Sequence, residues 1–371
     1  MTAPTLEDTP TIREFAFADA EIGAAWDAVV PGAITPYPFV SRAWAEPWWD
    51  VFGGDAELLL LSVVGSGGML VGVAPLMIER IPELGRAVRF LGGVDVTDYL
   101  DLVARPDDAP RAWAAVVNWL LAHRERWDAL DLHCLPDASP SRTLIADALA
   151  AHEDLAVVTA QEEVCPAVPL QGGFEAYLAG IGKKYRNEIR RKERNLVRDE
   201  PTAALRVVRG RDEALALLPD FFRLHRLSAA DKERFLTPQV EEFFRRVTIS
   251  TAEAGNLALY VLEIGGSPVA MMYAFLAADR LLVYNSGFDP TRSETSVGMV
   301  LTGMMIADAA ESGVAVCDFM RGNESYKYRF GAEDAPLWRV IAGADRASVE
   351  GAAAAMTAAL TTPADDRNQE E

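Results

Sequence analysis

The segment Lys183–Arg198 concentrates positive charge in an acidic chain. It reads KKYRNEIRRKERNLVR and carries eight Lys or Arg against two Glu, whereas the whole chain has a formal net charge of −20. Its apolar residues recur at roughly helical spacing, which predicts a helix with one buried stripe. Guanidinium groups bind phosphate oxygens in pairs, so Arg186 and Arg190 are candidate substrate-binding residues. The alternative is a solvated face that balances the acidic remainder of the chain.

A second candidate site follows the strand-like run LLVYNSGFDP. There TRSETSVGMV places small hydroxyl residues and a glycine at the start of a helix with no acidic residue in its first two turns. Free backbone N–H groups and the positive end of the helix dipole suit a pyrophosphate. The alternative is an ordinary N-cap followed by a packing glycine. The candidate cofactor-binding residues are Thr295, Ser296, Val297, Gly298, Met299 and Val300.

The third candidate site is CDFMRGNESYKYRFG, which leaves the carboxyl end of a predicted strand. Ligands of α/β proteins bind at such ends. The segment offers Asp318 or Glu324 as a base, Tyr326 as an acid, Lys327 as a counter-charge and Arg321 as a substrate-binding residue. The alternative is structural, with Asp318 paired to Arg321 and Tyr326 packed.

His225, in FFRLHRL, is a further candidate catalytic base, because the unperturbed pKa of histidine lies near working pH. A lone histidine on an amphipathic helix is otherwise a structural residue. No Ser/His/Asp or Cys/His arrangement is evident, which favours direct attack on a substrate without a covalent enzyme intermediate.

These candidates lie in a chain whose predicted elements follow the same order twice. ELLLLSVV, GSGG and MLVGVAPLMIER predict a hairpin at 57–80, and LALYVLEI, GGSP and VAMMYAFLA predict another at 257–277. A strand, a helix and a short strand follow each hairpin. This order predicts a mixed α/β fold with a βαβ crossover in each copy and a tandem duplication.

The first copy differs at the junction that would bind a cofactor. It reads ARPDDAPRAW, where Asp107 and Asp108 would cap the helix and repel a phosphate. The first copy is therefore predicted to be degenerate and structural. Any cofactor is expected in the second.

Composition limits the classes of function. The chain has 371 residues, half of them hydrophobic, and its N-terminus has neither a basic nor a long apolar segment, which predicts a cytoplasmic protein without membrane insertion. Cys134, Cys165 and Cys317 are widely spaced and are expected to be buried thiols, with no metal site. The acidic balance argues against general nucleic-acid binding.

The motifs that carry a family resemblance span residues 11 to 345. They include PFVSRAWAEPWWDVFG, FLGGVDVTDYLDLV, KKYRNEIRRKERNL, and above all YNSGFDPTRSETSVGMVL followed by CDFMRGNESYKYRFG. Together they resemble GNAT-superfamily acyltransferases of the CelD/BcsL type, which are related to the FemA/FemB aminoacyl transferases. The glycine-rich pyrophosphate loop of simpler GNAT enzymes is reduced here to SETSVGM.

The resemblance implies two tandem GNAT-like folds, with a degenerate domain at 11–168, a donor-binding domain at 169–348 and a disordered Ala-rich tail at 349–371. It implies acetyl-CoA or another acyl-CoA as donor and an amine of a small, nucleotide-linked or cell-envelope-related acceptor. It also makes Arg186 and Lys327 the best matches to residues that contact anionic substrate groups. Two other functions stay open: an aminoacyl-tRNA-dependent transferase, which the net charge disfavours, and a non-catalytic binding module.

Overall fold

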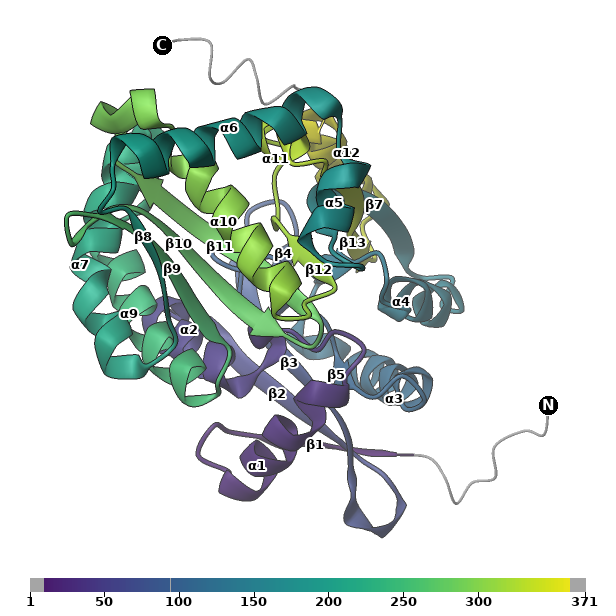
Figure 1. The fold of residues 1–371 in the computed structure, drawn as a ribbon. Helices are drawn as coiled ribbons and strands as arrows, with labels where there is room; N and C mark the ends of the chain where they lie inside the picture. The colour runs from purple at the N-terminus through teal and green to yellow at the C-terminus, as the bar shows by residue number, and fades with distance from the viewer. Residues whose placement is uncertain (1–9, 94, 361–371) are drawn as a thin grey trace. The chain divides into compact units, whose positions relative to one another are not determined.

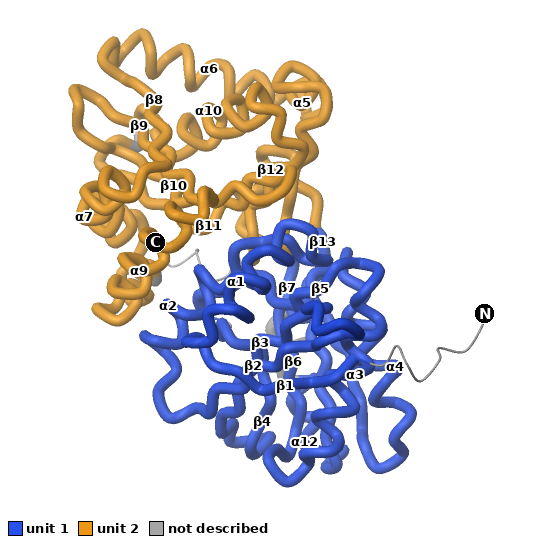
Figure 2. Tube along the Cα trace, turned by 90° about the horizontal axis from the view of Figure 1, so that it is seen from below, with its two compact units in different colours: residues 1–164, 335–371 blue, residues 165–334 orange. Residues whose placement is uncertain are grey.

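The computed structural model describes residues 10–93 and 95–360, which form two compact units. Unit 1 comprises Met1–Val164 together with Ala335–Glu371, and unit 2 comprises Cys165–Asp334 (Figure 2). Among the described helices, none is long and apolar enough to cross a lipid bilayer. The three cysteines are buried free thiols, as predicted.

Unit 1 contains one mixed sheet in the order β1-β2-β3-β4-β6-β13, with β5 paired to β3. All neighbouring strands run antiparallel except β4 and β6, which are parallel. The strands are β1 (Thr11–Phe15), β2 (Glu57–Val64), β3 (Leu70–Ile81), β4 (Gly85–Phe90), β5 (Val103–Ala104), β6 (Ala129–Pro136), the first part of β7 (Ala156–Pro169) and most of β13 (Glu333–Gly343). The helices are α1 (Ala20–Val29), α2 (Arg42–Phe52), α3 (Ala109–Ala122), α4 (Ser141–Ala150) and α12 (Arg346–Leu360).

Unit 2 contains a sheet in the order β7-β12-β11-β10-β9-β8, in which only β11 and β12 are parallel. Besides the end of β7, its strands are β8 (Ala204–Val208), β9 (Leu257–Ile264), β10 (Ser267–Ala277), β11 (Arg280–Phe288) and β12 (Val316–Asp318). The helices are α5 (Phe174–Gly180), α6 (Lys183–Asp199), α7 (Arg211–Ser228), α8 (Ala230–Phe235), α9 (Pro238–Glu253), α10 (Val297–Glu311) and α11 (Ser325–Arg329).

Helices cover both faces of the unit 2 sheet (Figure 1). On one face, Ile189 of α6 and Ile306 of α10 pack with Met272 of β10 in a core that continues into α5. On the other face, α7 and α9 meet the sheet through aromatic rings; Phe244 of α9 lies 5.3 Å from Tyr273 of β10, centroid to centroid. The strands are therefore buried on both sides, and function must be sought at their ends.

The two copies share one order of elements, so the predicted mixed α/β fold with a repeated unit is confirmed. Their last strands, however, are exchanged. β13, the last strand of the second copy, pairs with β6 of the first, and the end of β7 pairs with β12 of the second. Residues 335–348 consequently belong to unit 1, whereas the sequence assigned them to the second domain. A sequence read in contiguous blocks could not reveal this exchange.

The basic segment Lys183–Arg198 forms one helix, α6, as predicted, and a separate helix, α5, precedes it because the chain is extended at Ile181. One further element differs from expectation. The expected disordered tail contains α12, whose Val349 and Ala353 are buried beside Ile341 of β13. The rest of that prediction, residues 361–371, lies outside the described residues.

Candidate functional site

The sheet of unit 2 opens between its two parallel strands. β12 pairs with β11 only through Arg280, Leu281 and Leu282, opposite Val316–Asp318. β11 continues to Phe288, six residues past its last pairing with β12. The edge of β11 that faces β12 therefore has no described strand paired to it after Leu282, at the carboxyl end of the two parallel strands.

Backbone groups on this edge of β11 can be assigned from the register. The Asp289 N–H donates to Val269 O on β10 at 2.9 Å. Because successive residues of an antiparallel strand turn their N–H and C=O groups to opposite sides, those of Phe288 and Ser286 face away from β10. A β-bulge at Tyr284 precedes them, since Tyr273 pairs with Asn285 but Ala274 with Val283. Bulges recur beside active sites, where they redirect the strand.

Two cationic or titratable side chains reach this edge from the α7–α8 segment. His225 Nδ1 and Lys232 Nζ each lie 2.9 Å from the Ser286 carbonyl oxygen, and Lys232 Nζ is 3.1 Å from Ser286 Oγ. A carbonyl can only accept, so Nδ1 of His225 carries the proton and Nε2 is the basic nitrogen of the neutral ring. His225 is 1% exposed and packs beside Phe221 and Phe235.

The position of His225 depends on Gly287. A Cβ atom on this glycine would lie 2.4 Å from the backbone N of His225 and 2.6 Å from the carbonyl carbon of Leu224. Only glycine lets the α7 backbone approach β11 so closely. The predicted candidate His225 is thus brought to the open edge, together with Lys232, which the sequence analysis missed.

The start of α10 is the second part of the candidate donor site, and the open edge of β11 is the first. Ser296 occupies the N-cap with left-handed backbone angles (φ 51°), makes no side-chain cap, and no acidic residue lies in the first turn. Its Oγ accepts a hydrogen bond from Lys192 Nζ of α6 at 2.9 Å, and Lys192 also lies 3.4 Å from a carboxylate oxygen of Glu188. A lysine from α6 therefore stands at the positive end of the α10 dipole.

The other residues predicted around this turn have mixed surroundings. Thr295 Oγ1 donates to Arg292 O at 2.8 Å within the 3-10 turn η6 (Pro290–Thr295). Gly298 lies beside the ring of Phe288, 3.4 Å from a Cβ atom built on it. Val297 and Val300 are buried and Met299 packs against the same core, so the side chains of these three face the core, and residues of the first turn can offer a ligand only their backbone N–H groups.

The arginines predicted to bind phosphate are held by α5. Arg186 donates to Leu178 O at 3.3 Å, and Arg190 forms an ion pair with Glu175. Lys192, not these arginines, reaches the α10 start. The signal was present in the sequence, since Lys192 follows Tyr185 by seven residues and precedes Leu196 by four, which places it on the buried stripe.

The segment after β12 is held by internal charges. Asp318 is 1% exposed, lies 3.3 Å from Arg280 and accepts a hydrogen bond from the Met320 N–H. Met320 is left-handed (φ 61°), a strained conformation for a residue with a side chain. Arg280 is thus a charge partner of Asp318 that the sequence analysis did not name.

Lys327 is 2% exposed, and its ammonium group is fully engaged. It donates to the carbonyl oxygens of Met320, Arg321 and Gly322 at 3.1, 2.9 and 2.9 Å, and lies 2.9 Å from Glu324. An ammonium has three N–H donors, so none is left for a substrate phosphate. This arrangement suits a lysine that holds the loop in shape, whereas the sequence predicted a lysine that neutralises a charge on the substrate.

Glu324 and Tyr326 differ in what they can offer. The Glu324 side chain is 48% exposed and can be approached from solvent. Tyr326 packs edge-on against Phe319 at 6.2 Å, and burial, followed by the nearby Glu324 charge, raises the pKa of its phenol. Tyr326 therefore keeps its proton at neutral pH. Arg321 is half-buried in the same loop.

The equivalent opening in unit 1 is closed by the chain itself. β4 and β6 pair only at Ala87/Ala129 and Val88/Leu130. Beyond them, the Leu100 N–H donates to Cys134 O near the end of β6 at 2.9 Å, which covers the edge with backbone. The first copy is closed where the second is open.

A buried ionic cluster occupies the same end of the unit 1 sheet. Asp131, which is 0% exposed, receives His133 Nε2 at 2.7 Å and an ion pair from Arg339. Burial alone would raise the pKa of Asp131, but the hydrogen bond and charge of His133, and then Arg339, hold it below its ordinary value. These charged groups therefore pair with one another inside the cluster.

The helix start of the first copy also differs from its prediction. Asp108 is the N-cap residue of α3 but makes no side-chain cap, because its carboxylate pairs with Arg111. The expected capping by Asp108 is therefore wrong. Its negative charge still lies at the helix start.

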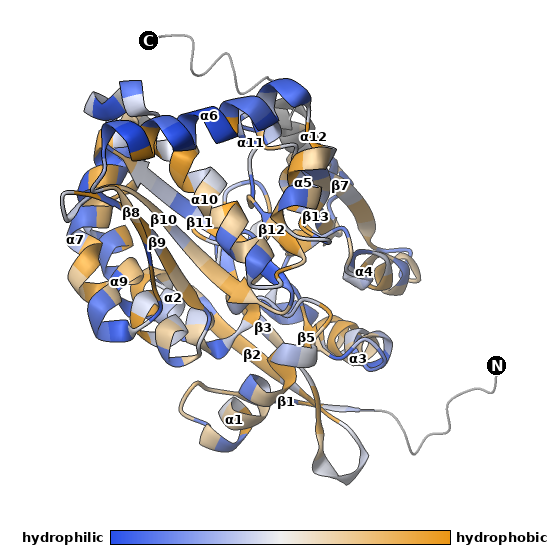
Figure 3. Cartoon of the chain, in the orientation of Figure 1, coloured by the Kyte–Doolittle hydropathy of each residue, from blue (hydrophilic) through white to orange (hydrophobic). Residues whose placement is uncertain are grey.

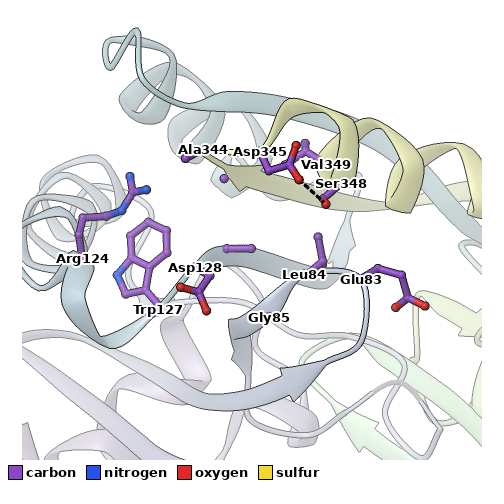
Figure 4. Close-up of a pocket in the computed structure, with 12 residues that line it drawn as sticks. Glu83, Leu84, Gly85, Arg124, Trp127, Asp128, Ala344, Asp345, Ser348 and Val349 are labelled. Atoms are coloured by element: carbon purple, nitrogen blue, oxygen red, sulfur yellow. Dashed lines mark hydrogen bonds between the residues drawn. The ribbon is translucent and has the colours of Figure 1, made fainter.

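A pocket in unit 1 lies at the other end of the same strands (Figure 4). It is lined where β4 and β6 begin, at Gly85 and Ala129, and where β13 leads into α12. Its polar groups have partners: Arg86 lowers the pKa of Asp128 to about 2, and Asp345 accepts from Ser348 Oγ at 2.8 Å. Across the described residues, no cluster of His, Cys, Asp or Glu suits a metal ion.

Residues 183–328 match the family described as the acetyltransferase (GNAT) domain. The matched residues all lie in unit 2, which is therefore similar to a GNAT-type acetyltransferase domain over this range. The match begins at the first residue of α6 and runs into α11, so it includes the open edge of β11 and the start of α10.

Solved structures share the fold at low sequence identity. FemX is 12% identical, with a TM-score of 0.60 over 88% of this chain and 96% of its own. A conserved protein of unknown function from Bacteroides thetaiotaomicron is 13% identical, with a TM-score of 0.54 over 90% and 99%. L-PGS from Bacillus licheniformis is 12% identical, with a TM-score of 0.52 over 88% and 98%. No curated protein sequence matches the chain. The finer resemblance to the CelD/BcsL type stays a prediction.

Proposed function

We propose that unit 2 transfers an acetyl or other acyl group from acyl-CoA to an amine. The observation that carries this proposal is the open edge of β11 beside the start of α10. The first turn of α10 has no acidic residue, and its N-cap residue, Ser296, accepts a hydrogen bond from Lys192. The edge amides of β11 would pair with the amides of the pantetheine arm, as a neighbouring strand would. The α10 N–H groups and Lys192 would bind the pyrophosphate.

The contrast between the two copies supports placing the donor in unit 2. In unit 1 the loop after β4 bonds to the end of β6, and Asp108 stands at the start of α3. A phosphate there would meet a carboxylate in place of Lys192. The reduced glycine loop SETSVGM is offset by this lysine, which supplies from a second helix the positive charge that the loop lacks.

The reaction would form one C–N bond and break the C–S bond of the thioester. The acceptor ammonium must lose a proton before it attacks, and the thiolate must gain one. Glu324, whose side chain is exposed, is one candidate base. His225 is the other, because its Nδ1–H donates to Ser286 O and Nε2 is the basic nitrogen of the neutral ring. Tyr326 is the candidate acid for the leaving thiolate. Asp318 and Lys327 would act by holding the loop.

The proposed acceptor is a small or cell-envelope-related amine that can carry a phosphate or nucleotide group. Arg321 is placed in the same loop as Glu324 and Tyr326, while Arg186 and Arg190 would first have to leave their α5 partners. An aminoacyl-tRNA donor is the second possibility, because the motifs also resemble FemA/FemB transferases. The net charge of −20 weighs against it.

Calorimetric titration with acetyl-CoA tests the proposal. Lys192→Met should weaken binding about ten- to a hundredfold, the range expected for one hydrogen bond to a charged group. Lys192→Arg should retain most of the affinity, and Asp108→Asn in unit 1 should bind like the wild type. Equal affinity of wild type and Lys192→Met would remove the donor from the α10 start. A change at Asp108 alone would place it in unit 1.

A further inference from the structure

The outer face of α6 carries a broad row of cations, most of which the proposed reaction does not use. The helix spans Lys183–Asp199, so its 17 residues extend about 25 Å. At 3.6 residues per turn, its buried residues Ile189 and Leu196 define one side of the helix. The opposite side presents Lys183, Lys184, Arg190, Arg191, Arg194 and Arg198.

Most of this row lacks a carboxylate neighbour. Arg190 pairs with Glu175 and Arg198 with Asp199. Among the residues that the structure describes, no ion pair engages Lys183, Lys184, Arg191 or Arg194. Eight cations against Glu188, Glu193 and Asp199 give α6 a net charge of +5, so the rest of the chain carries −20 − 5 = −25. The excess of positive charge on α6 therefore stands against a strongly acidic remainder of the chain.

The row also contains an apolar residue. Val197 is 56% exposed and, with Arg190, Glu193, Arg194 and Arg198, lines a shallow hollow along the helix. Figure 3 shows α6 as a hydrophilic helix along one edge of unit 2, above the more hydrophobic α10. No aromatic ring lies on the outer side, because Tyr185, the only aromatic residue of α6, packs into the core.

We propose that the outer face of α6 docks on an anionic phospholipid surface. A broad cationic face on one side of a helix can contact a planar anionic surface along the length of the helix, while the acidic remainder stays in solvent. An exposed valine among arginines suits the apolar boundary beneath lipid headgroups. A single-stranded nucleic acid would be expected to find aromatic rings for stacking, and this face has none.

The test compares two variants that have the same net charge. Lys184→Gln/Arg191→Gln/Arg194→Gln removes three cations from α6. Arg223→Gln/Arg245→Gln/Arg246→Gln removes three exposed arginines from α7 and α9. Both full-length proteins then carry −20 − 3 = −23. Binding is measured by co-sedimentation with phosphatidylcholine vesicles, with and without phosphatidylglycerol, over a series of salt concentrations.

We expect the wild type to bind only the phosphatidylglycerol vesicles and to lose binding as salt rises. The α6 variant should bind about a hundredfold more weakly, at about fivefold per cation. The α7/α9 variant should bind like the wild type. No binding by the wild type, or equal loss in both variants, would overturn the proposal. So would tight binding of RNA that depends on the same three residues while vesicles are ignored. No acyl donor is present, so the result is independent of the proposed reaction.

Discussion

The buried ammonium of Lys327 allows a quantitative test of how the loop after β12 is held. Lys327→Met keeps the length of the side chain and removes its charge. The three carbonyl oxygens of Met320, Arg321 and Gly322 would lose their donor, and Glu324 would lose its partner. Each hydrogen bond to a charged group contributes about 1.5–3 kcal/mol, but the exposed Glu324 can be hydrated instead. We therefore expect the free energy of unfolding to fall by about 3–5 kcal/mol.

The assay must report on unit 2. All eight tryptophans lie in unit 1, so fluorescence would miss a local effect, and urea unfolding should be followed by far-UV circular dichroism. Hydrogen exchange of the peptide spanning 316–332 should become faster. Lys192→Met, which loses one hydroxyl contact and one partly buried ion pair, is the matched control and should cost about 1 kcal/mol. A Lys327→Met protein within about 0.5 kcal/mol of the wild type would refute the structural assignment and return Lys327 to substrate binding.

Three other expectations concern buried groups. Burial raises the pKa of Asp101, so the contribution of this carboxyl group to the free energy of unfolding is fully present below its pKa in the unfolded chain and is lost as pH rises through its pKa in the folded protein. Between those two values, Asp101→Asn should become more stable relative to the wild type as pH rises. Parallel curves of stability against pH for the two proteins would contradict this. Arg339→Met should cost about 3–5 kcal/mol by tryptophan-monitored unfolding, because it strips a charge partner from buried Asp131, and adding Asp131→Asn should recover part of the loss. Gly287→Ala should cost about 1–3 kcal/mol by forcing α7 off β11, whereas Gly180→Ala, which meets open space, should be neutral.

Local patterns predicted much of the fold. The two hairpins appear as β2–β3 and β9–β10, and the apolar helix of the second copy appears as α10. These elements are set by residues close in sequence, through glycine turns and helical periodicity. The exchange of β7 and β13 depends on pairing between strands far apart in the chain, which periodicity cannot show.

The candidate site was predicted in part. The sequence placed Ser296 and Gly298 at one helix start, as the structure has them. It also indicated His225 as a candidate, but not the close approach of α7 to Gly287 that brings His225 to β11. Lys192 was missed among eight cations, because only its place on the buried stripe distinguishes it. Lys327 was read as a free charge, since nothing in the sequence indicates that three carbonyl groups converge on it.

The central claim is that the α10 start binds the pyrophosphate of acyl-CoA. Gly298→Asp places a carboxylate in the first turn, where it should stabilise the helix while repelling the ligand, so loss of binding would not reflect loss of folding. Gly210→Asp, at the open N-cap of α7, is the control. Measured by thermal shift with acetyl-CoA, the wild type and Gly210→Asp should be stabilised equally, and Gly298→Asp should show no shift. An equal shift in all three proteins would contradict the account.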